Sequence, residues 1–426
     1  MRRREPFTGY ILRTGLTIEP FGDDVADTLI ANERLADTQA RAIRAAGGTP
    51  REIRSPAELA PGPAVILPDR VYVSDKFLKD FVGAIPRDAA AMAGLTRCIS
   101  VDYNLPIQDV EVEGGDGGAV FYSCFFVPDA AAYAREPDLA AVEAAAKRDA
   151  RRTTVKMREL SAVLRLPTLG RQARIFRFPI TSTVASHVTH WVTILRLNTI
   201  QWGVRWLEFM RGDVLSMAAK TAGSLAAGMT INPYTIMSRI NVIGEGCEIH
   251  PTAYVEASFI GRNAKIGAGA TIRNTFVGDG AVVGDCAYAM NSVLGAESYL
   301  QESTALIWDV IYPGSSISNV KVQMSMIGRD TYINTWCSFL DAKFIGDVMV
   351  DHRGQLVSSG TSFLGSCVGH NCMMGGKTLI MPGRMIPNGT FMVMRPDECV
   401  VEIPPDLPAG VPLIRDKGTL VPMKRG

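Results

Sequence analysis

One histidine stands in a setting where the chain could carry out proton transfer. His370 lies in the segment "VGHNCMMGGK", with Asn371 next to it and Lys377 at the end of the segment. A neutral imidazole, with a pKa near about 6.5, can take a proton from a hydroxyl or an amine close to neutral pH. The nucleophile would then come from the substrate, so His370 alone would suffice as general base, and Asn371 or Lys377 could bind acceptor or donor. The alternative is a structural role at the corner of a repeat.

The other four histidines are weaker candidates for chemistry. His187 and His190 are three residues apart and could hold a metal ion from one helical face. No carboxylate or cysteine near them in the sequence completes a ligand set, which favours a structural role. His250 lies in the phrase "IHPTA", where a structural role is also favoured, and His352 lies upstream of His370 in "VDHRGQLVSSG".

Composition bounds the class of protein. The chain has 426 residues, 47% of them hydrophobic and 20% charged, which is typical of a globular protein with room for two or three domains. Its 44 Lys and Arg residues nearly balance 43 Asp and Glu residues, so no global field attracts nucleic acid or an anionic membrane. Eight scattered cysteines without a CxxC pair indicate reduced thiols in a cytoplasmic protein. No apolar run reaches the roughly 18 residues of a membrane span, and the first residues do not resemble a signal peptide.

An aliphatic residue followed by glycine recurs with a period of 17 residues in the C-terminal half, and with steps of 16, 18 and 19 residues towards its end. Within each period the aliphatic positions are spaced six, six and five apart, as in Ile243, Ile249 and Val255. Such a pattern predicts a three-sided coil that points one aliphatic residue inward per side and buries it by stacking on its neighbours. About eight coils fit between residues 240 and 390. The recurring pairs begin at Ile243, Ile260, Val277, Leu294, Ile327, Ile345 and Leu364.

This nested pattern resembles the hexapeptide repeat of left-handed parallel β-helix proteins, as in "INVIGEGCEIHPTAYVEASFIGRNAKIGAGATIRNTFVGDGAVVGDC". The resemblance implies acyl or acetyl transferases, sugar-nucleotide pyrophosphorylases or γ-class carbonic anhydrases, often as trimers. The segment around His370 is similar to that of the acyltransferases, which implies a general base and an acyl-CoA or acyl carrier donor. The carbonic anhydrases need a third histidine a few residues after the second, and no histidine follows His370.

The N-terminal half alternates apolar runs with helical patterns, which predicts an α/β domain with a mostly parallel sheet. Its order resembles the sugar-nucleotide pyrophosphorylase domain in "RAIRAAGG" and "AVILPDRVYVSDKFLKDF", and the resemblance implies Asp69 as a Mg²⁺ ligand. The alternative for Asp69 is a turn residue after a strand. The phosphate loop departs from the family, because "LTIEPFGDDVADTLIAN" has one glycine, and Asp23, Asp24 and Asp27 stand where a lysine should neutralise phosphate.

The sequence therefore divides into four parts: a degenerate nucleotidyltransferase-like α/β domain (residues 1–180), a helical connector (185–235), the left-handed parallel β-helix (236–395) and a C-terminal capping tail (396–426). Residues 147–177 carry ten Lys and Arg against two acids, which would suit an anionic ligand or a solvated helical face. Large residues predicted on the solenoid sides indicate a homo-oligomer, most simply a trimer. They are Tyr254, Phe259, Phe276, Trp308, Tyr312, Trp336 and Phe344.

Two functions remain open from the sequence. The first is a transferase that acts on a sugar nucleotide or amino sugar, with acyl transfer at the β-helix and His370 as its base. The second is a non-catalytic pseudo-nucleotidyltransferase that senses sugar nucleotides or scaffolds an oligomeric assembly. We expect small-molecule partners and no nucleic acid in either case.

Overall fold

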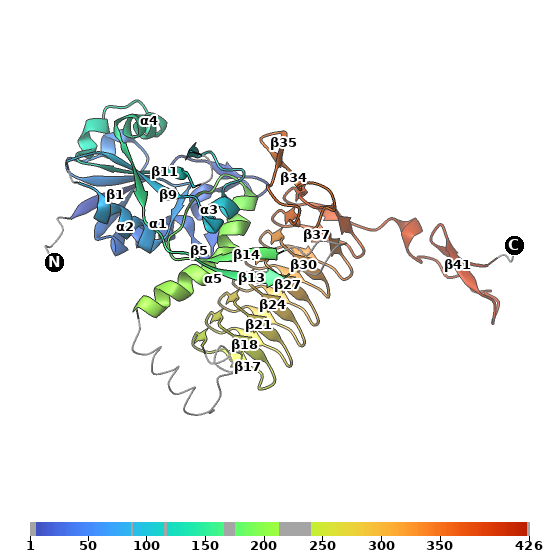
Figure 1. The fold of residues 1–426 in the computed structure, drawn as a ribbon. Helices are drawn as coiled ribbons and strands as arrows, with labels where there is room; N and C mark the ends of the chain where they lie inside the picture. Colours follow the sequence, from blue (N-terminus) through green and yellow to red (C-terminus); the bar gives the residue numbers. More distant parts are fainter. Residues whose placement is uncertain (1–5, 87, 115–116, 166–174, 213–239, 424–426) are drawn as a thin grey trace.

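A computed structural model describes residues 6–423 of the protein except 87, 115–116, 166–174 and 213–239. An α/β domain lies beside a long solenoid, and helix α5 (Trp191–Gly212) runs between them (Figure 1). The expected connector over 185–235 falls partly outside the described residues.

The α/β domain is built on a mixed sheet with the strand order β12-β9-β11-β7-β1-β6, and β10 pairs with β11. Strand β1 pairs in parallel with β6 and β7, whereas β11 is antiparallel to both β7 and β9. The α/β class expected from the sequence is confirmed, but the expected mostly parallel sheet is wrong, because β11 runs antiparallel to β7, β9 and β10. The strands are β1 (Phe7–Leu12), β6 (Gly48–Ile53), β7 (Ala64–Pro68), β9 (Ala91–Thr96), β10 (Glu111–Glu113), β11 (Ala119–Val127) and β12 (Arg151–Val155).

Amphipathic helices cover this sheet. In α2 the Ser74 side chain caps the first turn by accepting from the Phe77 amide, and Phe77 and Phe81 lie four residues apart on the buried face. Asp138 caps α4 in the same way. The helices of this domain are α1 (Leu35–Ala45), α2 (Asp75–Ala84), α3 (Ile99–Asn104) and α4 (Leu139–Asp149). Short paired strands complete it: β2 (Thr17–Ile18), β3 (Asp23–Asp24), β4 (Leu29–Ile30), β5 (Glu33–Arg34), β8 (Val71–Val73), β13 (Leu160–Arg165), β14 (Ile175–Ile180) and β15 (Ala185–His187).

The C-terminal half is a left-handed parallel β-helix with three sheets, which confirms the three-sided coil. The first sheet holds β16 (Val242–Ile243), β19 (Phe259–Ile260), β22 (Phe276–Val277), β25 (Val293–Leu294), β28 (Val310–Ile311), β31 (Met326–Ile327), β36 (Cys367–Val368) and β39 (Met385–Ile386). The second holds β17 (Glu248–Ile249), β20 (Lys265–Ile266), β23 (Val282–Val283), β26 (Tyr299–Leu300), β29 (Ser316–Ile317), β32 (Tyr332–Ile333), β37 (Met373–Met374) and β40 (Phe391–Met392). The third holds β18 (Tyr254–Glu256), β21 (Thr271–Arg273), β24 (Tyr288–Met290), β27 (Ala305–Ile307) and β30 (Lys321–Gln323), and β33 (Ser338–Phe339) pairs with β38 (Leu379–Ile380) further on.

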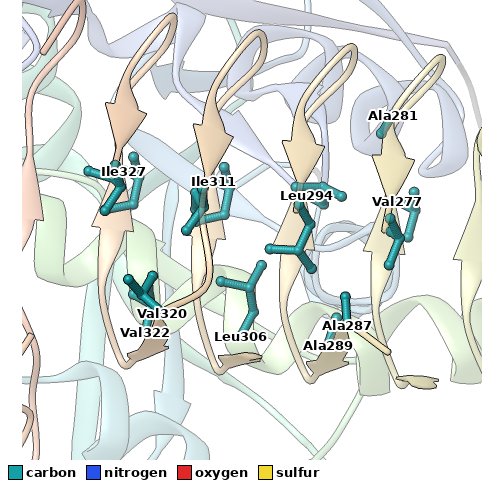
Figure 2. Packing of buried hydrophobic residues seen from close by; sticks show 14 of the residues in the cluster. Val277, Ala281, Ala287, Ala289, Leu294, Leu306, Ile311, Val320, Val322 and Ile327 are labelled. Atoms are coloured by element: carbon teal, nitrogen blue, oxygen red, sulfur yellow. The ribbon is translucent and has the colours of Figure 1, made fainter. Parts of the chain in front are cut away.

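The solenoid core consists of columns of stacked aliphatic side chains. Figure 2 shows Val277, Leu294, Ile311 and Ile327 side by side on the strands of successive coils, and each is at most 3% exposed. Each inner side chain therefore contacts its equivalents in the coils before and after it, and no coil buries its core alone. Corners between sides take left-handed backbone, as at Asn274 with φ of 51°.

One expected coil is wrong. The pair Ile345-Gly346 lies in an insertion between β33 and β36 that contains the hairpin β34 (Met349–His352) and β35 (Gln355–Ser358), and Ile345 is 86% exposed. The coil that follows Ile327 resumes at Val368, which pairs with it in the first sheet. The long steps in the period mark this excursion, because an insertion at a corner leaves the stacking of the inner columns intact.

The outer face of the first sheet is covered by the chain itself. Phe276 and Tyr312 belong to one buried cluster with residues of α5 and of the loop 15–32. Phe259 packs on Trp206, and Trp308 meets Phe363 edge to face. These aromatic residues were expected to mark an oligomer contact, but they pack within the chain, and only Trp336 and Phe344 of that set are largely exposed.

The tail does not cover the last coil as expected. Residues 399–423 form a separate hairpin of β41 (Leu413–Asp416) and β42 (Thr419–Pro422) that projects away from the solenoid (Figure 1). In the described part of the chain, no helix is long and apolar enough to cross a membrane.

We predict that Leu306→Ala destabilises the protein by about 2–5 kcal/mol, because Leu306 is fully buried in an inner column and the coil cannot collapse around the cavity. Chemical denaturation followed by circular dichroism measures the effect. The control is Lys321→Ala on the exposed side of the next coil, expected within about 0.5 kcal/mol of the wild type. Equal effects of the two substitutions would contradict the stacked core.

Candidate functional site

His370 lies at a corner of the solenoid just after β36 and faces the α/β domain. Only 6% of the residue is exposed. Its ring stacks on Phe21 of the N-terminal loop, with centroids 4.7 Å apart, and lies 5.9 Å from the ring of Tyr312. Phe21 and Tyr312 stack on each other as well, at 5.4 Å. The imidazole therefore sits in an aromatic cluster where the two halves of the chain meet.

Both ring nitrogens of His370 are engaged. The backbone N–H of Arg329 donates to Nδ1 at 2.7 Å, which requires a lone pair on that nitrogen. The proton of the neutral ring is then on Nε2, which donates to Oδ2 of Asp23 at 3.0 Å. In this arrangement neither nitrogen has a free lone pair for a substrate proton.

The Asp23 side chain bonds to two partners on the β-helix, His370 and Arg329. Its other carboxylate oxygen accepts from the Arg329 guanidinium, and Arg329 also lies over the ring of Tyr312. Burial raises the pKa of Asp23, but the hydrogen bond and charge of His370 and the charge of Arg329 outweigh it, so that the pKa lies below its ordinary value. Asp23 is thus held as a carboxylate by two groups of the β-helix.

Further hydrogen bonds fix the same loop on the solenoid. Asn388 donates to the carbonyl of Phe21 at 2.7 Å, and its side-chain oxygen accepts from the His370 amide. The Leu29 amide donates to the Tyr312 hydroxyl at 3.2 Å. We call Phe21, Asp23, Tyr312, Arg329 and His370 the interdomain clasp.

Asp69 does not form a magnesium site. The residue is fully buried, Oδ2 accepts from the Thr14 amide and Oδ1 from the Thr14 hydroxyl, both at 2.7 Å. Burial raises the pKa of its carboxyl group, against the Thr14 hydrogen bonds. A divalent cation needs free oxygens from several groups, and among the described residues no three His, Cys, Asp or Glu side chains gather for a metal. The residues present do not fit Mg²⁺.

Asp69 nevertheless lies in the same network as the clasp. Arg13 Nε is 4.0 Å from Oδ2 of Asp69, and Arg13 Nη2 donates to Asp24 at 3.2 Å. Asp24 is the neighbour of Asp23 in β3. Asp69 and His370 are 301 positions apart in the sequence. The structure places them at the two ends of one series of polar contacts, which runs through Arg13 and the adjacent Asp24 and Asp23.

Asn371 and Lys377, the predicted substrate-binding residues, lie at two successive corners with β37 between them. Both have left-handed backbone, with φ of 54° and 60°, and both are exposed. Lys377 Nζ lies 5.8 Å from the ring centre of Trp336. Asn371 adjoins His370 in the chain, but the imidazole is turned towards Asp23.

His187 and His190, which precede α5, form hydrogen bonds with different partners. His187 Nε2 accepts from the Ser123 amide at 3.0 Å, and His190 Nε2 lies 2.9 Å from the carbonyl oxygen of Asp351. Burial lowers the pKa of both imidazoles to about 4. Each ring therefore stays neutral and serves packing between elements.

The basic segment 147–177 contributes to a hollow on the α/β domain. A cavity of about 650 Å³ is lined by Lys76, Lys79 and Arg158, and an adjoining one of about 570 Å³ by Lys76, Lys156 and Arg158. Asp75, Asp80 and Glu208 also line the larger cavity. Lys76 pairs with Asp80, whereas Lys79, Lys156 and Arg158 form no ion pair with other described residues.

Sequence reasoning missed the clasp because its members were examined one by one. Asp23 was noted as out of place in a phosphate loop and His370 as a lone histidine in a repeat. Two unusual residues in one chain are a signal that they could pair. Phe21 and Arg329 carried no such signal.

Comparison with known proteins adds one family match. Residues 224–327 match the model of the GMPPB C-terminal domain, and the matched region covers the first coils of the solenoid. This match and the observed architecture confirm the resemblance to a hexapeptide β-helix protein related to nucleotidyltransferases. No curated protein matches the chain.

Among solved structures, a mutant of perosamine N-acetyltransferase from Caulobacter crescentus, in complex with CoA and GDP-perosamine, is similar at 16% identity. The similarity covers 36% of this chain and 53% of that chain, so the match spans about half of the acetyltransferase. Its TM-score of 0.16 is too low to support an argument about fold or function.

We predict a coupling energy of about 0.5–3 kcal/mol between Asp23 and His370 in a double-mutant cycle of Asp23→Ala and His370→Ala. The reason is their partly buried hydrogen bond and the rest of the clasp that depends on it. Denaturation of the four proteins measures it. A control cycle pairs Asp27→Ala, on the same loop but half-exposed and paired with Arg34 instead of the solenoid, with His370→Ala and should give additive effects. Additive effects in both cycles would show that the contact between Asp23 and His370 does not contribute to the free energy of unfolding.

The clasp also predicts a pH dependence. The pKa of Asp23 is lower in the folded than in the unfolded chain, so its stabilisation is complete above the unfolded pKa and is lost as pH falls through the folded pKa. The difference in unfolding free energy between the wild type and Asp23→Asn should therefore be constant near neutrality and shrink below about pH 4. Urea denaturation at stepped pH measures it. A difference that grows on acidification would contradict the assignment.

Proposed function

We propose that this chain is a non-catalytic relative of the sugar-nucleotide transferases, which binds a nucleoside-diphosphate sugar or similar phosphorylated ligand and scaffolds an assembly. One observation carries the proposal: the loop that should bind phosphate is held on the β-helix by the pairing of Asp23 with His370 and Arg329. This one contact engages both the loop that would bind phosphate in a nucleotidyltransferase and His370, the residue that would be the base in an acyltransferase.

The hollows at Lys76 and Arg158 are the place where we propose that the ligand binds. Lys79, Lys156 and Arg158 place three cations without described ion-pair partners around them, and phosphate groups are recognised by such cations. The volume of about 650 Å³ falls in the range of small-molecule sites, about 300–1,000 Å³. Glu208, whose pKa is raised by burial and by the nearby Asp75, lies at the same cavity and could accept or donate towards a hydroxyl group.

We further propose that the protein is cytoplasmic and a homo-oligomer, with a trimer as the simplest state of a solenoid of this kind. Fewer residues support the homo-oligomer than the sequence suggested, because α5 and the loop 15–32 already cover the first sheet of the solenoid. It comes from exposed apolar side chains of the last coils, such as Trp336, Met373 and Phe391.

Acyl transfer at His370 is the second candidate, favoured by the Asp23–His370 pair itself. A carboxylate that accepts from Nε2 would orient the ring and stabilise the imidazolium formed when Nδ1 takes a proton. The Arg329 amide would first have to release Nδ1, and an acyl-CoA or acyl carrier donor and an amino sugar acceptor would have to reach the corner. Asn371 and Lys377 would then be the nearby binding groups in the chain.

Calorimetry with UDP- and GDP-sugars, with and without Mg²⁺, tests the main proposal, together with a pyrophosphate exchange assay. We expect binding that does not depend on Mg²⁺, and no pyrophosphate exchange. The double variant Lys79→Ala/Arg158→Ala should bind at least tenfold more weakly, since it loses two phosphate contacts of about 1.5–3 kcal/mol each. The matched control is Lys265→Ala, an exposed lysine on the solenoid. Robust exchange would refute the non-catalytic assignment, and unchanged binding in the double variant would refute the site.

An assay with acetyl-CoA and a panel of amino sugars tests the second candidate. The main proposal predicts no turnover. Turnover that His370→Ala abolishes while the variant stays folded would establish acyl transfer instead.

A further inference from the structure

The last coils of the solenoid differ from the first ones on their outer surface. At the outward position of the second sheet, Glu248 and Lys265 stand in the first coils, whereas Met373 and Phe391 stand in the last ones. Met373 is 50% and Phe391 68% exposed. Other exposed apolar residues of the same coils are Trp336, Leu379, Met381 and Val393. We call these six residues the end patch.

The end patch adjoins an open sheet edge. Strands β39 and β40 are the terminal members of the first and second sheets, each paired with a described strand on one side only. A parallel edge of this kind presents unpaired backbone groups and is normally covered. In the described chain no strand pairs with the free side of β39 or β40, and the tail leads away from the coil after residue 395 (Figure 1).

The tail is itself a surface without a partner. Residues 399–423, the C-terminal arm, bond to one another and to the adjoining Pro396, with Val401 bonded to Gly418 and Met423 bonded to Pro412. Val401 is 63%, Ile403 69% and Ile414 46% exposed. A two-stranded hairpin with apolar residues in water is marginal by itself. The arm therefore needs an apolar surface, and preferably a strand edge, to be stable.

We propose that the C-terminal arm of one copy covers the end patch and the open edge of the last coil of a second copy. The two surfaces match in character, since one lacks a covering strand and the other is an extended apolar segment. They occur in equal numbers because one chain carries both. The arm projects away from its own last coil (Figure 1), so another chain would have to supply the cover of that coil.

The contact is heterologous, because the arm of each copy meets the end patch of the next. Such contacts form a closed ring when the rotation between copies closes. The inference rests on the proposed homo-oligomer and specifies how it is held together.

Light scattering at micromolar concentration tests the proposal on the full chain. The wild type should have the mass of two or more chains of 46.1 kDa each. Val401→Glu with Ile403→Glu on the arm, and separately Phe391→Glu on the end patch, should each reduce it to a single chain. The control is Leu356→Glu, a comparably exposed apolar residue (62%) on the hairpin β34–β35 outside the end patch, which should leave the mass unchanged.

Mixing the two variants separates arm exchange from general loss of solubility. The Phe391→Glu protein keeps an intact arm and the double arm variant keeps an intact end patch, so the mixture should form a pair with one working contact. A monomeric wild type would refute the homo-oligomer and the arm exchange together. An oligomer that persists in both variants would refute the arm exchange while the homo-oligomer stands.

Discussion

The packing of the N-terminal loop and α5 on the first side of the β-helix is the constraint on which the rest of the structure depends. Tyr312 on the solenoid, Phe21 on the loop and Trp191 on α5 belong to one buried cluster. Hydrophobic burial brings these elements together without specifying their register. The hydrogen bonds of Asp23, Asn388 and Tyr312 supply that register, because each of them joins a defined donor to a defined acceptor across the contact.

This packing decides what chemistry the chain can perform. A loop that binds a triphosphate must present backbone amides to the ligand, but here the Leu29 amide and the Asp23 carboxylate of the loop 15–32 bond to the solenoid, and the Val25 and Thr28 amides bond within the loop. A histidine that acts as base must present a lone pair to the acceptor, but Nδ1 of His370 is taken by the Arg329 amide. The carboxylates that looked unfavourable for phosphate binding have protein partners: Asp23 pairs with Arg329 and His370 on the other half of the chain. Asp24 pairs with Arg13 and Asp27 with Arg34 inside the α/β domain.

The solenoid could be predicted from the sequence because its contacts repeat at short range. Ile260 and Val277 stack on each other 17 positions apart, so the period of the aliphatic residues in the sequence predicts which side chains pack together. The clasp could not be predicted, because Asp23 and His370 are 347 positions apart and no local pattern records their contact. The same reason explains the aromatic side residues: Phe276 and Tyr312 were recognised as too apolar for solvent, but sequence alone could not show that the chain's own helix and loop cover them.

The tautomer of His370 tests the central claim most directly. Selective ¹⁵N labelling of the five histidines, with His370→Asn to assign its resonances, reports which ring nitrogen carries the proton. The clasp predicts a protonated Nε2 and an unprotonated, hydrogen-bonded Nδ1 at neutral pH. Asp23→Ala removes the acceptor of Nε2 and should shift the Nε2 resonance. A proton on Nδ1 and a free lone pair on Nε2 in the wild type would contradict the account and make His370 available as a base.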